Sequence, residues 1–175
     1  MIKMSSNGDL FTVVVTSVFK APKWKIWNNI STFQGVNYEL FPFLRMTCPE
    51  PNARLSIDMV TKDPLFRSWL LLFGFLPIEF DLIRIDSIEE GTSFKERSSM
   101  FLMQEWHHDR SLESVTIEGY EEGCTKVIDK LSFRPRIFNL LFGYFLKHVV
   151  KFLFTYRHYR LASMFGRFGF TKVDT

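Results

Sequence analysis

The feature that most constrains the fold is a run of five strand-like segments, each separated from the next by a short turn. They cover residues 66–75, 78–87, 92–100, 104–116 and 125–133, and Pro, Gly or a tight join falls between them. Connections this short can join only antiparallel neighbours, because a parallel crossover needs a dozen or more residues. The sequence therefore predicts an antiparallel meander rather than βαβ units.

Two further strands and two short helices are expected before this meander. Residues 10–19 are rich in β-branched side chains and alternate as a strand does, and residues 44–47 form a second, shorter candidate. Between them, Pro22 suits the first turn of a helix that ends near Ser31. A second helix over 33–40 is weakened by Gly35, and 56–61 is compatible with either helix or strand.

A long helix is predicted from about Ile137 to Phe165, after Pro135 ends the last strand. Apolar side chains recur at steps of three and four and form one stripe, with Phe145, Val149 and Phe152 at its centre facing the sheet. Lys147 and Lys151 interrupt the segment, so it lacks the uncharged run that a membrane span needs. The apolar segment 69–78 is far too short to span.

These elements define an α+β domain in which a curved, seven-stranded antiparallel sheet grips a long C-terminal helix. One domain is expected over residues 1–175, with its core at about 9–166. The 20 Phe, 5 Tyr and 4 Trp residues indicate either an aromatic core or a cavity for an apolar molecule. The two cysteines, Cys48 and Cys124, show no metal-ligand spacing, and no secretory signal is apparent, so a cytoplasmic protein with reduced thiols is expected.

Charge is unevenly distributed along the chain. Residues 79–123 hold twelve acids against four bases, whereas residues 134–172 hold eight bases and no acid. We interpret this mainly as a basic helix lying against an acidic sheet, with transient contact between that helix and a membrane as a further expectation. No module for nucleic acid is present, and no nucleic-acid partner is expected.

The alternation of side chains along the strands predicts a polar cluster inside the sheet. In 104–116, Trp106, His108 and Arg110 share a face that should point inward. A tight join at 101–103 places Glu96 opposite His108 and Ser98 opposite Trp106. A turn centred at 120–121 places Arg110 opposite Leu131, with Asp129 on its diagonal. The expected cluster is Glu96, His108, Arg110 and Asp129, set among Phe94, Trp106 and Phe133.

Three interpretations of this cluster remain open. It can be a buried charge network, it can orient a ligand in an apolar pocket, or His108 and Glu96 can act as acid and base. The sequence contains no recognised catalytic, nucleotide-binding or metal-binding motif, so neither a catalytic residue nor a cofactor is assigned. A carrier or sensor is favoured over an enzyme.

Several segments resemble the START-like, birch-pollen-allergen superfamily, often labelled SRPBCC, and within it an uncharacterised bacterial branch. The resemblance lies in 15–19 followed by Ala21, Pro22 and Trp27, and in 43–47, 67–74, Trp106-x-His108-x-Arg110, 129–136 and 157–161. It implies a helix-grip fold with a cavity between sheet and long helix that holds lipids, polyketides, quinones or similar molecules. Carriers, sensors, polyketide cyclases, dehydratases and coenzyme Q-binding proteins share this fold, so function is not fixed by it.

The expected function is therefore binding or transport of an apolar small molecule in this cavity. The alternatives are a cyclase or dehydratase that uses His108 and Glu96, and an interaction protein with no ligand. The expected ligand-binding residues are Trp69, Phe94, Glu96, Trp106, His108, Arg110, Asp129, Phe133, Phe145, Val149 and Phe152.

Overall fold

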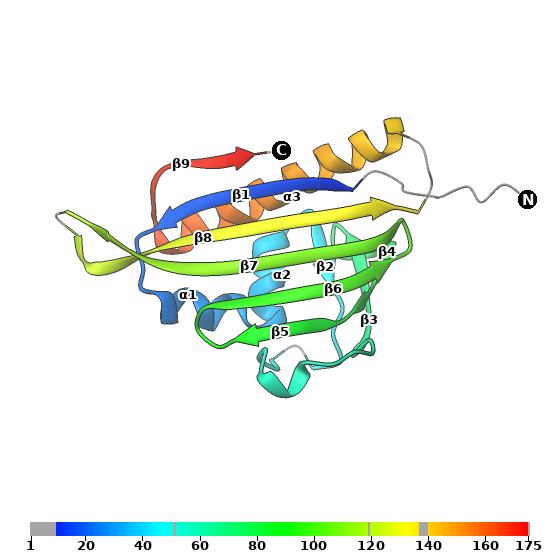
Figure 1. The fold of residues 1–175 in the computed structure, drawn as a ribbon, viewed down its shortest axis with the longest axis horizontal. Coiled ribbons are helices and arrows are strands. Elements are labelled where there is room, and N and C mark those ends of the chain that lie inside the picture. Colours follow the sequence, from blue (N-terminus) through cyan, green and yellow to red (C-terminus); the bar gives the residue numbers. More distant parts are fainter. Residues whose placement is uncertain (1–9, 51, 119, 137–139, 175) are drawn as a thin grey trace, which may run out of the picture.

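The computed structural model describes residues 10–50, 52–118, 120–136 and 140–174 of the chain. Its curved antiparallel sheet and three helices confirm the predicted α+β architecture (Figure 1). The strands are β1 (Phe11–Phe19), β2 (Leu44–Met46), β3 (Phe66–Leu72), β4 (Leu76–Ile83), β5 (Ile85–Glu89), β6 (Ser93–Met100), β7 (Met103–Ile117), β8 (Tyr120–Pro135) and β9 (Arg167–Asp174). The helices are α1 (Lys23–Ile30), α2 (Phe33–Leu40) and α3 (Leu140–Phe165), with a 3₁₀ turn, η1, at Ile57–Met59.

The described sheet has nine strands, in the order β2-β3-β4-β6-β7-β8-β1-β9, with β5 paired to β6. Sequence analysis expected seven. One extra strand arises because 78–87 divides: β4 pairs with β3 and β6, and β5 makes a separate pairing with β6. The other is β9, a short strand after α3 that pairs with the outer edge of β1. The segment 56–61 becomes the 3₁₀ turn η1.

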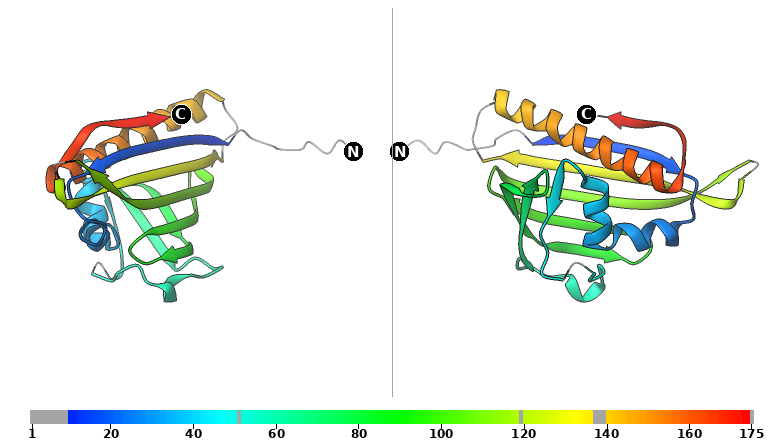
Figure 2. Two further views of the ribbon diagram at one scale, coloured as in Figure 1. Left: turned by 60° about the vertical axis from the view of Figure 1, so that its left-hand side comes forward. Right: turned by 180° about the vertical axis from the view of Figure 1, so that it is seen from behind.

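All three helices lie on the same face of the sheet, with α3 along β1 and β8 (Figure 2). The sheet residues on this face are those that strand alternation predicts; in β1 every second residue from Phe11 to Phe19 is buried. The face of α3 that packs on the sheet differs from the prediction. Phe145 and Phe152 are 61% and 52% exposed, while the buried residues are Leu146, Val150, Phe154, Arg157, His158 and Leu161. Because α3 is apolar on nearly all sides, periodicity alone could not select its buried face.

The buried apolar residues form two clusters rather than one. The first lies under α1 and the end of α3 and includes Phe19, Ile30, Phe94, Leu112, Val127 and Leu161. The second lies under the first half of α3 and includes Val13, Trp106, Leu131, Phe133, Val150 and Phe154. On β1, β7, β8 and α3 the residues between the two clusters are polar and buried. This polar layer is where the candidate site lies. No helix in the described part of the chain has the length and hydrophobicity to cross a membrane.

Gly35 permits the close contact between α1 and α2. A Cβ atom at this position would lie 1.8 Å from the backbone oxygen of Asn29, the penultimate residue of α1. Thr32 begins α2 by accepting a hydrogen bond from the Gly35 amide at 3.1 Å, so the helix forms despite the glycine. Gly35, which weakened the sequence prediction of this helix, is thus required for its packing against α1.

We expect Gly35→Ala to destabilise the protein by about 1–3 kcal/mol, because backbone atoms must move to admit the methyl group. This loss runs against the higher helix propensity of alanine, which would favour the variant by about 1 kcal/mol. Urea unfolding followed by circular dichroism measures the difference. Gln34→Ala, at the exposed neighbouring position of α2, is the matched control. A G35A variant as stable as Q34A would show that α1 and α2 do not pack in this way.

Candidate functional site

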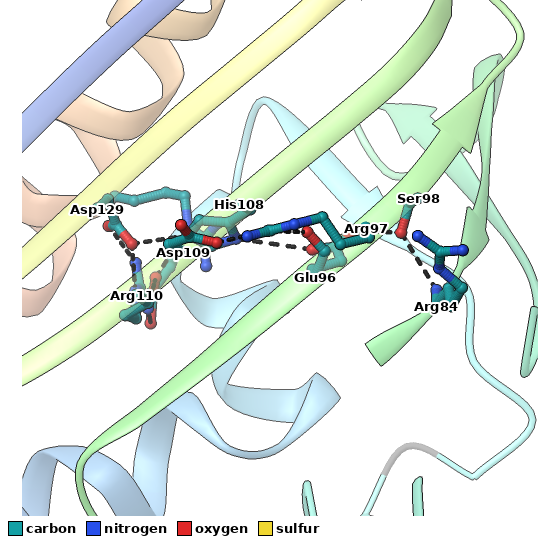
Figure 3. A network of polar contacts seen from close by, with 10 residues as sticks. Arg84, Glu96, Arg97, Ser98, His108, Asp109, Arg110 and Asp129 are labelled. Atoms are coloured by element: carbon teal, nitrogen blue, oxygen red, sulfur yellow. Dashed lines mark hydrogen bonds and ion pairs between the residues drawn. The ribbon is translucent and has the colours of Figure 1, made fainter. Parts of the chain in front are cut away.

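A belt of buried polar side chains crosses the sheet between the two apolar clusters. It runs from β4 across β6, β7 and β8 to β1 and is completed by α2 and α3 (Figure 3 shows its centre). We call this group the polar belt; its members are Ser17, Glu39, Asp81, Glu96, Ser98, His108, Arg110, Asp129, Arg157 and His158. Each strand member occupies an inward position in register with its neighbours.

Asp129 is the centre of the polar belt. Its carboxylate is fully buried and accepts four hydrogen bonds. Arg110 donates two of them, from Nε to Oδ1 at 2.6 Å and from Nη2 to Oδ2 at 2.7 Å. His108 donates from Nε2 to Oδ1 at 2.7 Å, and His158 from Nε2 to Oδ2 at 2.9 Å. Burial alone would raise the pKa of Asp129, but the charge and hydrogen bonds of Arg110, together with His108, hold it well below its usual range.

Glu39 on α2 is the second buried carboxylate, and sequence analysis did not identify it. Arg110 Nη1 lies 3.2 Å from both of its oxygens, and Arg157 Nε donates to Oε2 at 2.8 Å. Two arginines therefore face two carboxylates in an almost fully buried space, which balances their charges. Burial would lower the pKa of Arg110, but the charges of Asp129 and Glu39 raise it. The one sequence signal for Glu39 is its position four residues after Gly35, on the buried side of α2.

His158 closes the belt on the side of α3. Burial lowers its pKa, and its Nε2 donates to Asp129 Oδ2 at 2.9 Å. Its Nδ1 lies 2.9 Å from Ser17 Oγ on β1. Arg157, the residue before His158 on α3, is also buried and is paired with Glu39.

Glu96 and its neighbours form the other end of the belt. The predicted register is confirmed here: Glu96 lies opposite His108, and Ser98 lies opposite Trp106. Glu96 Oε1 accepts a hydrogen bond from Ser98 at 2.7 Å, and Oε2 lies 3.6 Å from His108 Nδ1. Burial would raise the pKa of Glu96, but His108, Ser98 and Asp81 lower it. Burial, reinforced by the charge of Glu96, raises the pKa of Asp81 well above its usual range.

The predicted register of β7 and β8 is wrong, because each β7 residue faces a β8 residue two positions earlier than predicted. Arg110 lies directly opposite Asp129, and His108 lies opposite Leu131. The cause is the position of the turn: Ile117 pairs with Tyr120, so the turn comes before Tyr120 and not at 120–121, and a register shift between Val115 and Ile117 offsets part of the difference. A count from the turn moves every facing pair along the ladder when the centre of the turn is misplaced. The correction strengthens the expected cluster, because Arg110 and Asp129 become direct cross-strand partners.

A pocket of about 320 Å³ opens on the Glu96 end of the belt. Its walls are α2, the end of α1, the segment 46–66 and strands β4 to β7, and most of its lining is apolar. Three belt residues reach it: Glu96 from β6, His108 from β7 and Arg157 from α3. Among the described lining residues, Arg157 is the only one from α3, so the pocket lies beside α2 and not along the long helix as expected.

The structure separates the expected ligand-binding residues into three groups. Phe94, Glu96 and His108 line the pocket. Arg110, Asp129, Trp106 and Phe133 are buried but do not line it; the first two are held by hydrogen bonds within the polar belt, and the last two pack in the second apolar cluster. Trp69, Phe145, Val149 and Phe152 lie outside it, and all but Val149 are strongly exposed. Sequence analysis missed the lining from 46–66 because that segment has no periodic pattern.

We expect Arg110→Met to cost about 3–5 kcal/mol of stability, or to prevent folding, because it leaves Asp129 and Glu39 as buried carboxylates without their shared cation. The matched control is Arg97→Met. Arg97 pairs with Asp109 across the same two-strand ladder as Glu96 and His108, but on the half-exposed side, where side chains are 19% and 34% exposed. Its loss should cost less than about 1 kcal/mol. Equal losses in urea unfolding would contradict the structural role of Arg110.

Comparison with solved structures identifies this architecture as a helix-grip fold. A Chromobacterium violaceum protein is 11% identical with a TM-score of 0.60, covering 89% of this chain and 97% of its own. The Zhui aromatase/cyclase from Streptomyces sp. R1128 is 11% identical with a TM-score of 0.55, covering 89% and 96%. Ara h 8.0201 is 14% identical with a TM-score of 0.53, covering 88% and 99%. At these identities the likeness shows the fold alone.

The sequence comparisons define the family. No curated protein matches the sequence. The family model described as "Domain of unknown function (DUF8410)" matches residues 17–165, which include all ten members of the polar belt. The chain therefore belongs to the DUF8410 family.

Proposed function

We propose that the protein binds a small apolar molecule that carries a carbonyl or carboxylate oxygen. The observation that supports this is the pocket of about 320 Å³, in which an apolar lining surrounds one wall of polar side chains. Pockets for small molecules commonly combine these two features, at volumes of about 300–1,000 Å³. An interaction protein with no ligand would not need an internal pocket of this size, so the pocket argues against that alternative.

Arg157 supports the choice of an oxygen-bearing ligand. Its Nε donates to Glu39 and its guanidinium lies 4.7 Å from the centre of the Phe154 ring. Its two terminal nitrogens donate no hydrogen bond to any other residue in the described part of the chain. Arg157 is 94% buried (6% exposed) and lines the pocket, so a ligand oxygen is the natural acceptor for these donors.

Glu96 and His108 supply the other polar groups on the same wall of the pocket. The 3.6 Å between Glu96 Oε2 and His108 Nδ1 is longer than a good hydrogen bond, so both groups can contact a ligand hydroxyl. Hydrogen bonds to residues that do not line the pocket fix their positions, because His108 donates to Asp129 and Glu96 accepts from Ser98. This rigid support suits a site that orients a ligand.

The experiment is a fluorescence titration with 2-naphthoate, whose aromatic body and carboxylate match the two kinds of lining. We expect saturable binding by the wild type and its loss in Val36→Trp, because Val36 lines the pocket and the indole would fill it. Gln34→Trp adds the same indole to the exposed side of the same helix and should bind as the wild type does. Binding that is equal in V36W and Q34W would place the ligand elsewhere and refute the proposal.

An acid–base enzyme of the cyclase or dehydratase type is the second candidate. The observation that favours it is that His108 and Glu96 reach the pocket wall together. A carboxylate beside an imidazole can move a proton to or from a bound molecule. A carrier returns its ligand unchanged, whereas a dehydratase releases water from it, so mass spectrometry of the bound molecule before and after incubation distinguishes the two.

A further inference from the structure

Residues 68–78 form the end of a hairpin and do not line the pocket. It contains no charged residue and is folded as the end of β3, the turn after it and the start of β4. These two strands lie at the right-hand side of the sheet in Figure 1, at the opposite end from the β7–β8 turn. The sequence predicted strands here, too short at 69–78 to span a membrane, and a ligand-binding role for Trp69.

The end of this hairpin is apolar and exposed on both of its faces. Phe73 is 58% exposed, Phe75 75%, Leu76 49%, Ile78 46% and Trp69 42%. A hairpin of a water-soluble antiparallel sheet normally buries one face and presents polar side chains on the other. Here neither face is covered by the described part of the chain. We call Trp69, Phe73, Phe75, Leu76 and Ile78 the aromatic tip.

At the turn of this hairpin, an aromatic residue occupies a backbone conformation that favours a different residue type. Phe73 has φ 52° and Gly74 has φ 83°. Two successive positive φ values define a turn that prefers Asn or Gly at its first position, and a bulky residue there is strained. The Phe73 side chain gains little burial in return, because more than half of it is exposed.

The apolar surface continues beyond the hairpin. The Phe73 amide donates to the Phe43 carbonyl at 2.9 Å, and the Phe43 ring packs edge-on against Phe152 of α3 at 5.3 Å between centroids. Phe41, two residues before Phe43, is 63% exposed, and Phe152 is 52% exposed. The aromatic tip is therefore one part of a larger apolar surface.

The charges beside the aromatic tip are positive. Arg45 is exposed on β2 opposite Leu71, and Arg67 is exposed at the base of β3, 4.8 Å above the Phe80 ring. Residues 64–78 contain no acid. The next acid along the chain, Glu79, is buried and accepts hydrogen bonds from the amides of Phe101 and Leu102 at 2.7 and 2.9 Å. Its charge is thus held inside by backbone donors.

We propose that the aromatic tip inserts into the surface of a membrane that contains anionic lipids. Exposed aromatic and aliphatic side chains enter the interfacial layer, and the flanking arginines attract anionic headgroups. Insertion is limited to that layer, because open strand edges are not tolerated in the hydrocarbon core. A second copy of the chain fits less well, since a symmetric contact would bring the arginines of both copies together.

The sequence suggested that the basic C-terminal helix contacts a membrane, whereas this proposal assigns the contact to the hairpin. The proposal rests on the exposed side chains, the turn geometry and the charges at the hairpin, so it does not depend on what the pocket binds. The hairpin and the pocket are nevertheless connected, because Phe66, the first residue of β3, lines the pocket.

The test is co-sedimentation with vesicles of phosphatidylcholine, alone or with a quarter of phosphatidylserine. We expect the wild type to bind the anionic vesicles more tightly than the neutral ones, and less tightly at high salt. The double variant Phe73→Asn/Phe75→Ser should bind at least about tenfold more weakly, because two apolar side chains are lost from the insertion. Asn suits the positive φ of position 73, so this variant keeps its fold, which circular dichroism verifies.

Trp24→Ser is the matched control, because Trp24 is 64% exposed but lies on α1, away from the hairpin. It should bind vesicles as the wild type does. Absence of vesicle binding by the folded wild type would overturn the proposal, and so would equal binding by the wild type and the double variant. A wild-type dimer that the double variant abolishes, without any vesicle binding, would instead assign the tip to self-association.

Discussion

The carboxylate of Asp129 is the constraint on which the rest of the interior depends. It is fully buried and is stabilised by donors from β7 and α3: two from Arg110 and one each from His108 and His158. A buried carboxylate is tolerated only when such donors surround it, and Glu39 meets the same requirement through Arg110 and Arg157. The helices and the sheet are therefore joined at this level by charge pairing, with apolar packing above and below it.

The polar belt has a saturated half and an open half. Around Asp129, the donors and acceptors satisfy one another and leave no group for a ligand. Around Glu96 and His108, the distance is 3.6 Å and the pocket lies alongside. Arg157 joins the two halves, because it pairs with Glu39 through Nε and lines the pocket. This division explains how one network can both hold the fold together and present polar groups to a bound molecule.

Much of the fold followed from local patterns, and the failures have physical causes. Strand alternation placed His108, Arg110 and Asp129 inward, and a tight join fixed Glu96 opposite His108, because both depend only on neighbouring residues. The β7–β8 register required the position of the turn, which the sequence prediction placed too late, and the buried face of α3 required knowledge of its partner. Glu39 was missed because its role exists only through tertiary contacts with two arginines. The 46–66 wall of the pocket carries no periodic signal.

The two histidines that share Asp129 allow the division of the belt to be measured. His108 lines the pocket, whereas His158 is fully buried between Asp129 and Ser17. In a spectrum of ¹⁵N-histidine-labelled protein, addition of 2-naphthoate should move the ring resonances of His108 and leave those of His158 in place. Equal movement of both rings, or no movement of His108 while the probe binds, would contradict the account.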